Sequence, residues 1–223
     1  MHLYWILFYI LVGIECLLLI PFTLRFKILD EGGKWTFYYL IASFFLAVAS
    51  YLIGLIWRNN MWFLATMYFI QFLILSRFFQ IVIKNLLFKR LITLTIIPIF
   101  IIFLVDVLKL EGLYAYNSYF ATIRTLILII YGAIYFWQLL KDEELVQKSV
   151  FINTLPNFWF NAAFFVYHSG SFMYSLSYNL LQQQQTPGVD TTRKVTVIIS
   201  YFAGIIQLIL LYIGLMKAKK KPL

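Results

Sequence analysis

Seven long apolar stretches fill this sequence, and nearly all of its charged residues lie between them. Each stretch is long enough for a helix, which needs about 20 residues to cross the hydrocarbon core of a bilayer. The stretches are Leu3–Leu24, Thr36–Trp57, Met61–Ile83, Leu91–Leu108, Tyr116–Leu140, Phe151–Leu181 and Val195–Met216. They lack the period-two alternation of membrane β-strands. The sequence therefore predicts an all-α fold, an integral membrane bundle of seven transmembrane helices.

Composition agrees with this fold class. Of the 223 residues, 63% are hydrophobic and only 12% are charged, about half the charged share of a soluble domain. The seven stretches take up most of the length, so residues 1–223 are predicted to form a single transmembrane domain. Chemistry that requires a soluble domain is therefore not expected of this chain.

The positive charges predict an orientation for the bundle. If the amino terminus lies outside, twelve Lys and Arg residues fall in inner segments and four in outer ones. The outer four are Arg58, Lys109, Arg193 and Lys194. The positive-inside rule then favours N-out, C-in. The net charge of +9 is interpreted as orientation and attraction to anionic lipid. Because no extended basic face exists, no nucleic-acid partner is expected.

Four charged residues lie within the predicted spans, where burying a charge is costly. Glu15 and Arg77 lie at compatible depths and could pair across neighbouring helices. Alternatively, Glu15 is protonated and the Arg77 side chain extends to the inner headgroups. Asp106 and Arg124 lie on consecutive antiparallel spans, so we expect a structural pair between them. Asp106 could instead belong to a frayed helix end.

The sixth stretch carries a polar stripe. Five of its residues follow spacings of 4, 7, 7 and 4, which places them on one helix face; they are Asn157, Asn161, His168, Ser175 and Asn179. Ser171 lies close to the same stripe. This face could form hydrogen bonds that hold the bundle together, line a ligand pocket, or transfer protons through His168.

The sequence argues against several kinds of catalytic or cofactor site. The last span has no lysine for a retinal Schiff base, and two histidines are too few for a zinc hydrolase. The lone cysteine, Cys16, can form neither an intramolecular disulfide nor a metal site by itself. We therefore expect no enzyme activity, no cofactor and no metal site.

Aromatic residues make up 20% of the chain, and many lie near the ends of the predicted spans. Belts of aromatic residues at the two membrane interfaces account for such a distribution. The alternative is a cavity, lined by aromatic side chains, that holds a lipid or a pigment.

One segment resembles known proteins. Residues 156–179 have a Pro-x-Phe-Trp start, a Tyr-x-Ser-Gly centre and a Ser-x-Asn end; the matching residues are Pro156, Phe158, Trp159, Tyr167, Ser169, Gly170, Ser177 and Asn179. This pattern resembles that of uncharacterised multispanning membrane proteins of Bacteroidetes, similar to membrane domains found with sensor histidine kinases. The resemblance implies a free-standing membrane domain in the bacterial inner (cytoplasmic) membrane.

The leading functional hypothesis is a sensory or receptor-like module that binds an apolar or amphipathic ligand, such as a lipid, within the membrane. It would signal to a separate partner, a sensor kinase or another membrane protein. The candidate ligand-binding residues are Glu15, Arg77, Arg124, Asn157, Asn161, His168 and Ser171. The alternatives are a small transporter or proton-coupled carrier and a scaffold subunit of a membrane complex.

Overall fold

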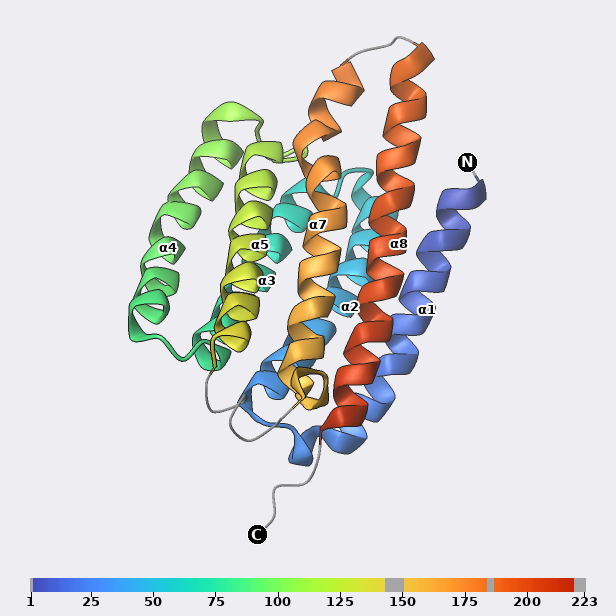
Figure 1. The fold of residues 1–223 in the computed structure, drawn as a ribbon. Coiled ribbons are helices and arrows are strands. Elements are labelled where there is room, and N and C mark those ends of the chain that lie inside the picture. The colour runs from blue at the N-terminus through green and yellow to red at the C-terminus, as the bar shows by residue number, and fades with distance from the viewer. Residues whose placement is uncertain (1, 143–150, 184–186, 219–223) are drawn as a thin grey trace.

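The computed structural model describes residues 2–142, 151–183 and 187–218. Seven long helices run roughly side by side in this part of the chain, and it contains no strand (Figure 1). The helices are α1 (His2–Arg25), α2 (Glu31–Trp57), α3 (Met61–Val82), α4 (Leu86–Val105), α5 (Ser118–Leu140), α7 (Pro156–Gln183) and α8 (Pro187–Lys217). The bundle has two ends. The C-terminal end carries the α1–α2 and α3–α4 connections, and the N-terminal end carries the α2–α3 and α4–α5 connections (Figure 1).

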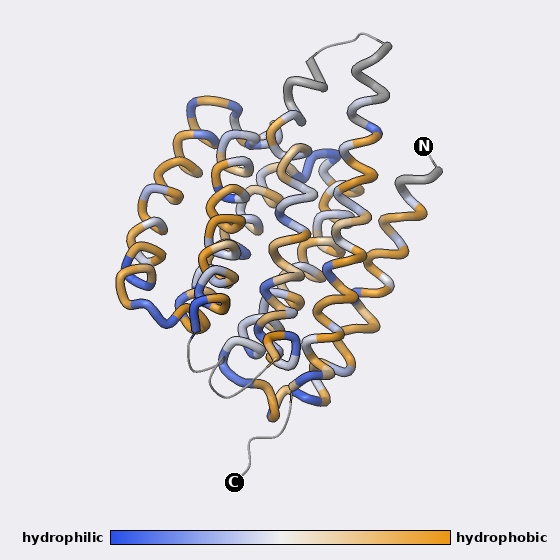
Figure 2. Tube along the Cα trace, viewed as in Figure 1, coloured by the Kyte–Doolittle hydropathy of each residue, from blue (hydrophilic) through white to orange (hydrophobic). Residues whose placement is uncertain are grey.

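Six of these helices are long and apolar enough to cross a membrane, as expected of a multi-pass membrane protein. They cover Trp5–Ile28, Glu31–Trp57, Met61–Val82, Leu86–Leu110, Ser118–Leu140 and Lys194–Lys217. The exception is α7, which has sufficient length at 28 residues but carries the polar stripe. Figure 2 shows the apolar residues spread along the helices and hydrophilic residues gathered at the connections.

The centre of the bundle is where α7 lies, packed against α5 and α8 and touching α2. The outer positions belong to α1, which packs on α2 and α8, and to α4, which packs on α3 and α5 (Figure 1). The side chains of Asn161 and His168 are almost completely buried. The stripe of α7 therefore faces other helices, which removes its polar groups from lipid.

Polar residues fix the helix boundaries. Helix α2 begins five residues before the predicted stretch because the Asp30 carboxylate accepts the Gly33 N–H at 2.8 Å, which caps the first turn. It ends at Trp57, because the next residue, Arg58, has a φ of 58° in the left-handed region. Helix α4 continues as a π-helical turn, Asp106–Leu110, so the fourth span is longer than predicted.

Small residues let α7 and α8 approach closely. A Cβ atom at Gly170 would lie 2.4 Å from the Cβ of Ala203, and one at Gly214 would lie 2.6 Å from Cε1 of Phe160. Close backbone approach through glycine and alanine is a common way for membrane helices to associate. This contact fixes how α8 lies beside the central helix.

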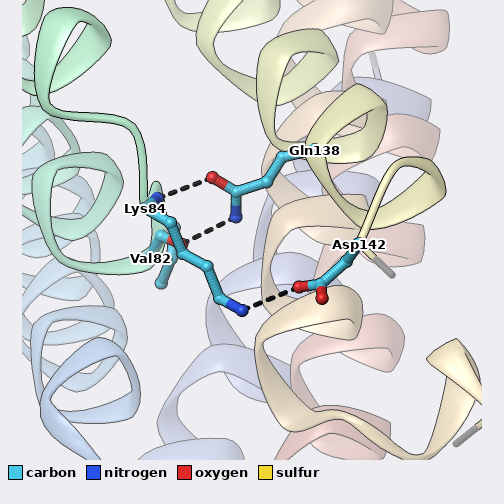
Figure 3. Close-up of polar contacts among 4 residues, drawn as sticks. All are labelled: Val82, Lys84, Gln138 and Asp142. Carbon is cyan, nitrogen blue, oxygen red and sulfur yellow. Dashed lines mark hydrogen bonds and ion pairs between the residues drawn. The ribbon is translucent and has the colours of Figure 1, made fainter. Parts of the chain in front are cut away.

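At the C-terminal end, one glutamine joins α5 to the α3–α4 connection (Figure 3). The side-chain carbonyl of Gln138 accepts the Lys84 N–H at 2.6 Å, and its amide donates to the Val82 carbonyl at 3.2 Å. The Lys84 ammonium group pairs with the Asp142 carboxylate at 2.8 Å. These contacts satisfy backbone groups that the end of α3 leaves without helical partners.

Candidate functional site

A cavity of about 520 Å³ lies among α1, α2, α3, α7 and α8, in the half of the bundle toward the N-terminal end. Its walls are largely aromatic and aliphatic; the aromatic lining residues are Trp5, Phe8, Tyr51, Tyr68, Tyr167 and Tyr201. Ligand cavities in proteins commonly have this size and an apolar lining with a few polar groups. This cavity is therefore the candidate functional site.

Glu15 supplies the carboxyl group of the cavity. Its side chain is almost completely buried, at 5% exposed, and the hydroxyl of Ser43 on α2 lies close to it. A carboxyl group in apolar surroundings needs a hydrogen-bond partner or a counter-charge. Within the part of the chain that the structure describes, Glu15 forms no ion pair. Because Glu15 lines the cavity, a small molecule in this space could bind its carboxyl group.

Two other polar residues of the wall, Ser50 and Asn60, are bonded to each other. The Asn60 side-chain amide donates to the backbone carbonyl of Ser50 at 3.0 Å and to its hydroxyl at 2.6 Å. These bonds tie the start of α3 to the C-terminal half of α2. They stabilise the wall of the cavity, and Glu15 supplies the carboxyl group among its described lining residues.

Aromatic contacts hold α1 against α2 at the cavity. The ring centroid of Tyr51 on α2 lies 6.2 Å from that of Trp5, in edge-to-face geometry, and 6.3 Å from that of Phe8. On the far side, Tyr167 brings the central helix α7 into the wall. The cavity thus lies between the peripheral helix α1 and the centre of the bundle.

Arg124 lies behind the cavity wall. Its guanidinium donates to the Tyr68 backbone carbonyl at 3.0 Å and its central carbon lies 4.6 Å from the centre of the Tyr68 ring. The side chain is buried, and its Nε has no hydrogen-bond partner in the structure. Arg124 therefore touches a residue of the cavity wall and does not line the cavity.

The expected Asp106–Arg124 pair is not formed in the part of the chain that the structure describes. Asp106 is fully buried, and its carboxylate accepts the backbone N–H of Phe120 at 2.8 Å. Glu111 accepts from Ser118 at the same helix start. Both carboxylates thus cap α5, where free N–H groups and the helix dipole favour negative charge.

Glu15 and Arg77 are not brought together either. Arg77 is an exposed residue near the end of α3, and its guanidinium donates to the Gln80 side-chain carbonyl at 3.1 Å. Arg77 lines a different cavity, between α3 and α4, whereas Glu15 lines the cavity among α1, α2, α3, α7 and α8. The predicted pair depended on the depth of each residue along its helix, which does not specify the faces on which the two side chains lie.

The stripe of α7 contacts the surrounding helices. The amide of Asn157 donates to the Asp30 carboxylate at 2.6 Å, and that of Asn161 donates to the Gly132 carbonyl on α5 at 3.2 Å. The Ser171 hydroxyl donates to the His168 carbonyl of its own helix at 3.4 Å. These contacts fit the interpretation that the stripe holds the bundle together.

Of two further members of the stripe, Ser175 follows this pattern and His168 does not. His168 is buried, and neither of its ring nitrogens has a hydrogen-bond partner in the structure. Ser175 accepts a hydrogen bond from the Tyr116 hydroxyl at 3.3 Å; burial raises the pKa of this phenol, which keeps it a donor. The side chain of Asn179 lies outside the described residues.

Of the seven candidate ligand-binding residues, Glu15 is the one found among the described residues that line the cavity. Sequence reasoning missed Tyr68, Tyr167 and Tyr201 as wall residues. Each is an aromatic residue well inside a helix, away from the membrane interfaces where aromatic belts form. That position is a signal that could have separated a cavity lining from a belt.

The described residues contain no group of three or more His, Cys, Asp or Glu side chains that could hold a metal ion. Cys16 is exposed on the surface of α1. Neither a family model, nor a curated protein, nor a solved structure shows significant similarity to this chain. Functional inference therefore depends on the geometry of the cavity.

Proposed function

We propose that this chain is a receptor-like module that binds an amphipathic small molecule in the cavity anchored by Glu15. The observation that carries the proposal is a buried carboxyl group, without an ionic partner among the described residues, in a cavity of about 520 Å³ with aromatic walls. An apolar body would fill the aromatic space. A polar head that donates a hydrogen bond, an amine or a hydroxyl, would bind Glu15.

The chemistry of the wall favours this class of ligand. A carboxylate and aromatic ring faces both attract a cationic or hydrogen-bond-donating head, since the ring face carries partial negative charge. The apolar lining gains free energy when a hydrophobic body displaces water from it. A purely anionic ligand is disfavoured because it would bring a second negative group to Glu15.

The proposed setting is a bacterial cytoplasmic membrane with seven crossings, N-out and C-in. The excess of Lys and Arg at the C-terminal end supports this orientation, and the length and central position of α7 support a seventh crossing. In this orientation the cavity lies in the outer half of the bundle. A ligand could then enter from the outer leaflet.

Signalling would require that the ligand bind two arrangements of the helices with different affinities. The peripheral helix α1 forms one wall of the cavity and packs mainly on α2 and α8. Its movement on ligand binding would reach the inner surface at Arg25. A separate membrane partner, such as a sensor kinase, would respond there.

Native mass spectrometry of the purified protein tests the binding proposal. We expect a co-purified amphipathic small molecule on the wild-type protein, lost from Ala47→Trp, which fills the cavity, and weakened in Glu15→Gln. The control is Val48→Trp, because Val48 is the neighbouring exposed residue and does not line the cavity. Equal occupancy in all four proteins, or none in the wild type, would overturn the proposal.

Reconstitution separates a receptor from a carrier that uses the same cavity. The ligand identified by mass spectrometry is loaded into proteoliposomes, and its release is measured over time. A receptor-like module retains it. Release that requires the protein and is lost in Ala47→Trp would instead support the carrier function.

A further inference from the structure

A second cavity, of about 480 Å³, lies between the last turns of α3 and the first turns of α4 at the C-terminal end. Three cationic side chains line it: Arg77 from α3 and Lys89 and Arg90 from α4. Gln80 and Thr93 add polar groups, and Ile81 and Leu86 add apolar ones. This set is distinct from the lining of the cavity that contains Glu15.

Hydrogen bonds between the two helices order the lining. The Arg77 guanidinium donates to the Gln80 side-chain carbonyl at 3.1 Å, and the Gln80 amide donates to the Thr93 hydroxyl at 3.0 Å. The Thr93 hydroxyl in turn donates to the backbone carbonyl of Lys89 at 3.1 Å. This chain positions the guanidinium and leaves its remaining N–H groups available for a ligand.

Within the part of the chain that the structure describes, no ion pair neutralises the positive charge of the cavity. The two ion pairs of the described residues are Lys34–Glu31 and Lys84–Asp142, and neither involves a cation of this cavity. Glu31 lies within electrostatic range of Arg77, but its carboxylate is bonded to Lys34 at 2.7 Å. Three cations facing one space repel each other, so an anion bound there would lower the electrostatic energy.

We infer that this cavity binds a phosphate group, supplied by the headgroup of an anionic lipid or by a soluble phosphate. Arginine binds phosphate oxygens with two parallel N–H groups, and lysine adds a point charge. Arg77 lies five residues before the end of α3, or about 7.5 Å along the helix axis, which suits the headgroup layer. The side chain of Leu86, 71% exposed at the rim, offers an apolar surface to an acyl chain.

The proposal is tested by lipid titration with native mass spectrometry. Purified protein in neutral detergent receives phosphatidylglycerol or phosphatidylcholine with the same acyl chains, and inorganic phosphate in a separate arm. Arg77→Gln/Arg90→Gln removes two cations from the cavity. The matched control, Lys27→Gln/Lys217→Gln, removes two cations from another cavity at the same end, where Asp30 and Glu31 are also present.

We expect wild type and control to bind phosphatidylglycerol well above phosphatidylcholine, and the Arg77/Arg90 variant to bind it roughly thirtyfold more weakly. If inorganic phosphate binds and the lipids do not, and the Arg77/Arg90 variant loses that binding, the site would be assigned to a soluble anion. Equal lipid binding by the Arg77/Arg90 variant and the control, or no preference for phosphatidylglycerol, would overturn the inference. Arg90→Gln alone, at an exposed position, provides the same comparison if the double variant does not fold.

Discussion

Arg124 on α5 binds Tyr68 on α3 twice, through a 3.0 Å hydrogen bond to the backbone carbonyl and through a cation–π contact at 4.6 Å to the ring. A guanidinium keeps its charge when it is buried, so its N–H groups need hydrogen-bond acceptors or an electron-rich surface in the protein. A carbonyl and a ring face provide them without a carboxylate. Because Tyr68 also lines the cavity, this contact links a buried charge to the shape of the candidate site.

Arg124 and Tyr68 should therefore be energetically coupled. Arg124→Leu and Tyr68→Leu are each expected to destabilise the bundle, and the double variant to be less destabilised than the sum by about 0.5–2 kcal/mol. The measurement is a double-mutant cycle of unfolding free energy in mixed micelles. A coupling of zero would show that the cation–π contact has no energetic effect.

Arg124 and Asp106, in contrast, should behave independently. Asp106→Leu removes the acceptor of the Phe120 N–H and should cost about 0.5–2 kcal/mol, as for the loss of a helix cap. Since the two side chains have no shared hydrogen-bond partner in the structure, the Arg124→Leu/Asp106→Leu cycle should be additive within about 0.5 kcal/mol. Recovery of stability in the double variant would instead support the ion pair between Asp106 and Arg124 that the sequence predicts.

The contacts of Arg124 and Asp106 illustrate which features the sequence could predict and which it could not. Hydropathy predicts the spans because length and apolarity are local properties of a segment. The depths of Arg124 and Asp106 follow in the same way. Their partners do not, because a partner depends on the rotation of each helix about its axis. A search for oppositely charged residues cannot find the partner of Arg124, because that partner is the neutral backbone carbonyl of Tyr68.

The candidate site was predicted in the same partial way. Glu15 could be identified because a carboxyl group is rare within a span. The positions of Tyr167 and Tyr201, well inside their helices, separate them from an interfacial belt, but only packing shows that the two side chains face a shared space. His168 and Asn161 were placed on an inward face, but that face meets α5 and other helices rather than the cavity.

The close approach of α7 and α8 gives a prediction about packing. Gly170→Ala would place a Cβ 2.4 Å from that of Ala203, so we expect a loss of about 1–3 kcal/mol from overpacking. The other atoms near this position are 3.8 Å away. Exchanging the two residues, as Gly170→Ala/Ala203→Gly, should therefore recover most of the loss.

The matched control for this exchange is Gly13→Ala, because no atom lies within 4 Å of a Cβ at Gly13. Its unfolding free energy should rise by about 0.5–1 kcal/mol, because alanine favours the helix interior over glycine. If Gly170→Ala were as well tolerated as the control, the contact between α7 and α8 would be looser than the structure has it.

The proposed orientation predicts which connections react with an impermeant thiol reagent in intact cells. Cys16 is first replaced by alanine, which leaves a chain without cysteine. Leu113→Cys, in the α4–α5 connection, and Asn153→Cys, before α7, then each add one exposed thiol at opposite ends of the bundle. Neither change alters a charge, so the distribution of Lys and Arg that determines orientation is kept.

We expect the reagent to label the cysteine at position 113 from outside and to label that at position 153 only after the cells are opened. The reverse pattern would place the cavity of Glu15 in the inner half of the membrane and the Arg77 cavity in the outer leaflet.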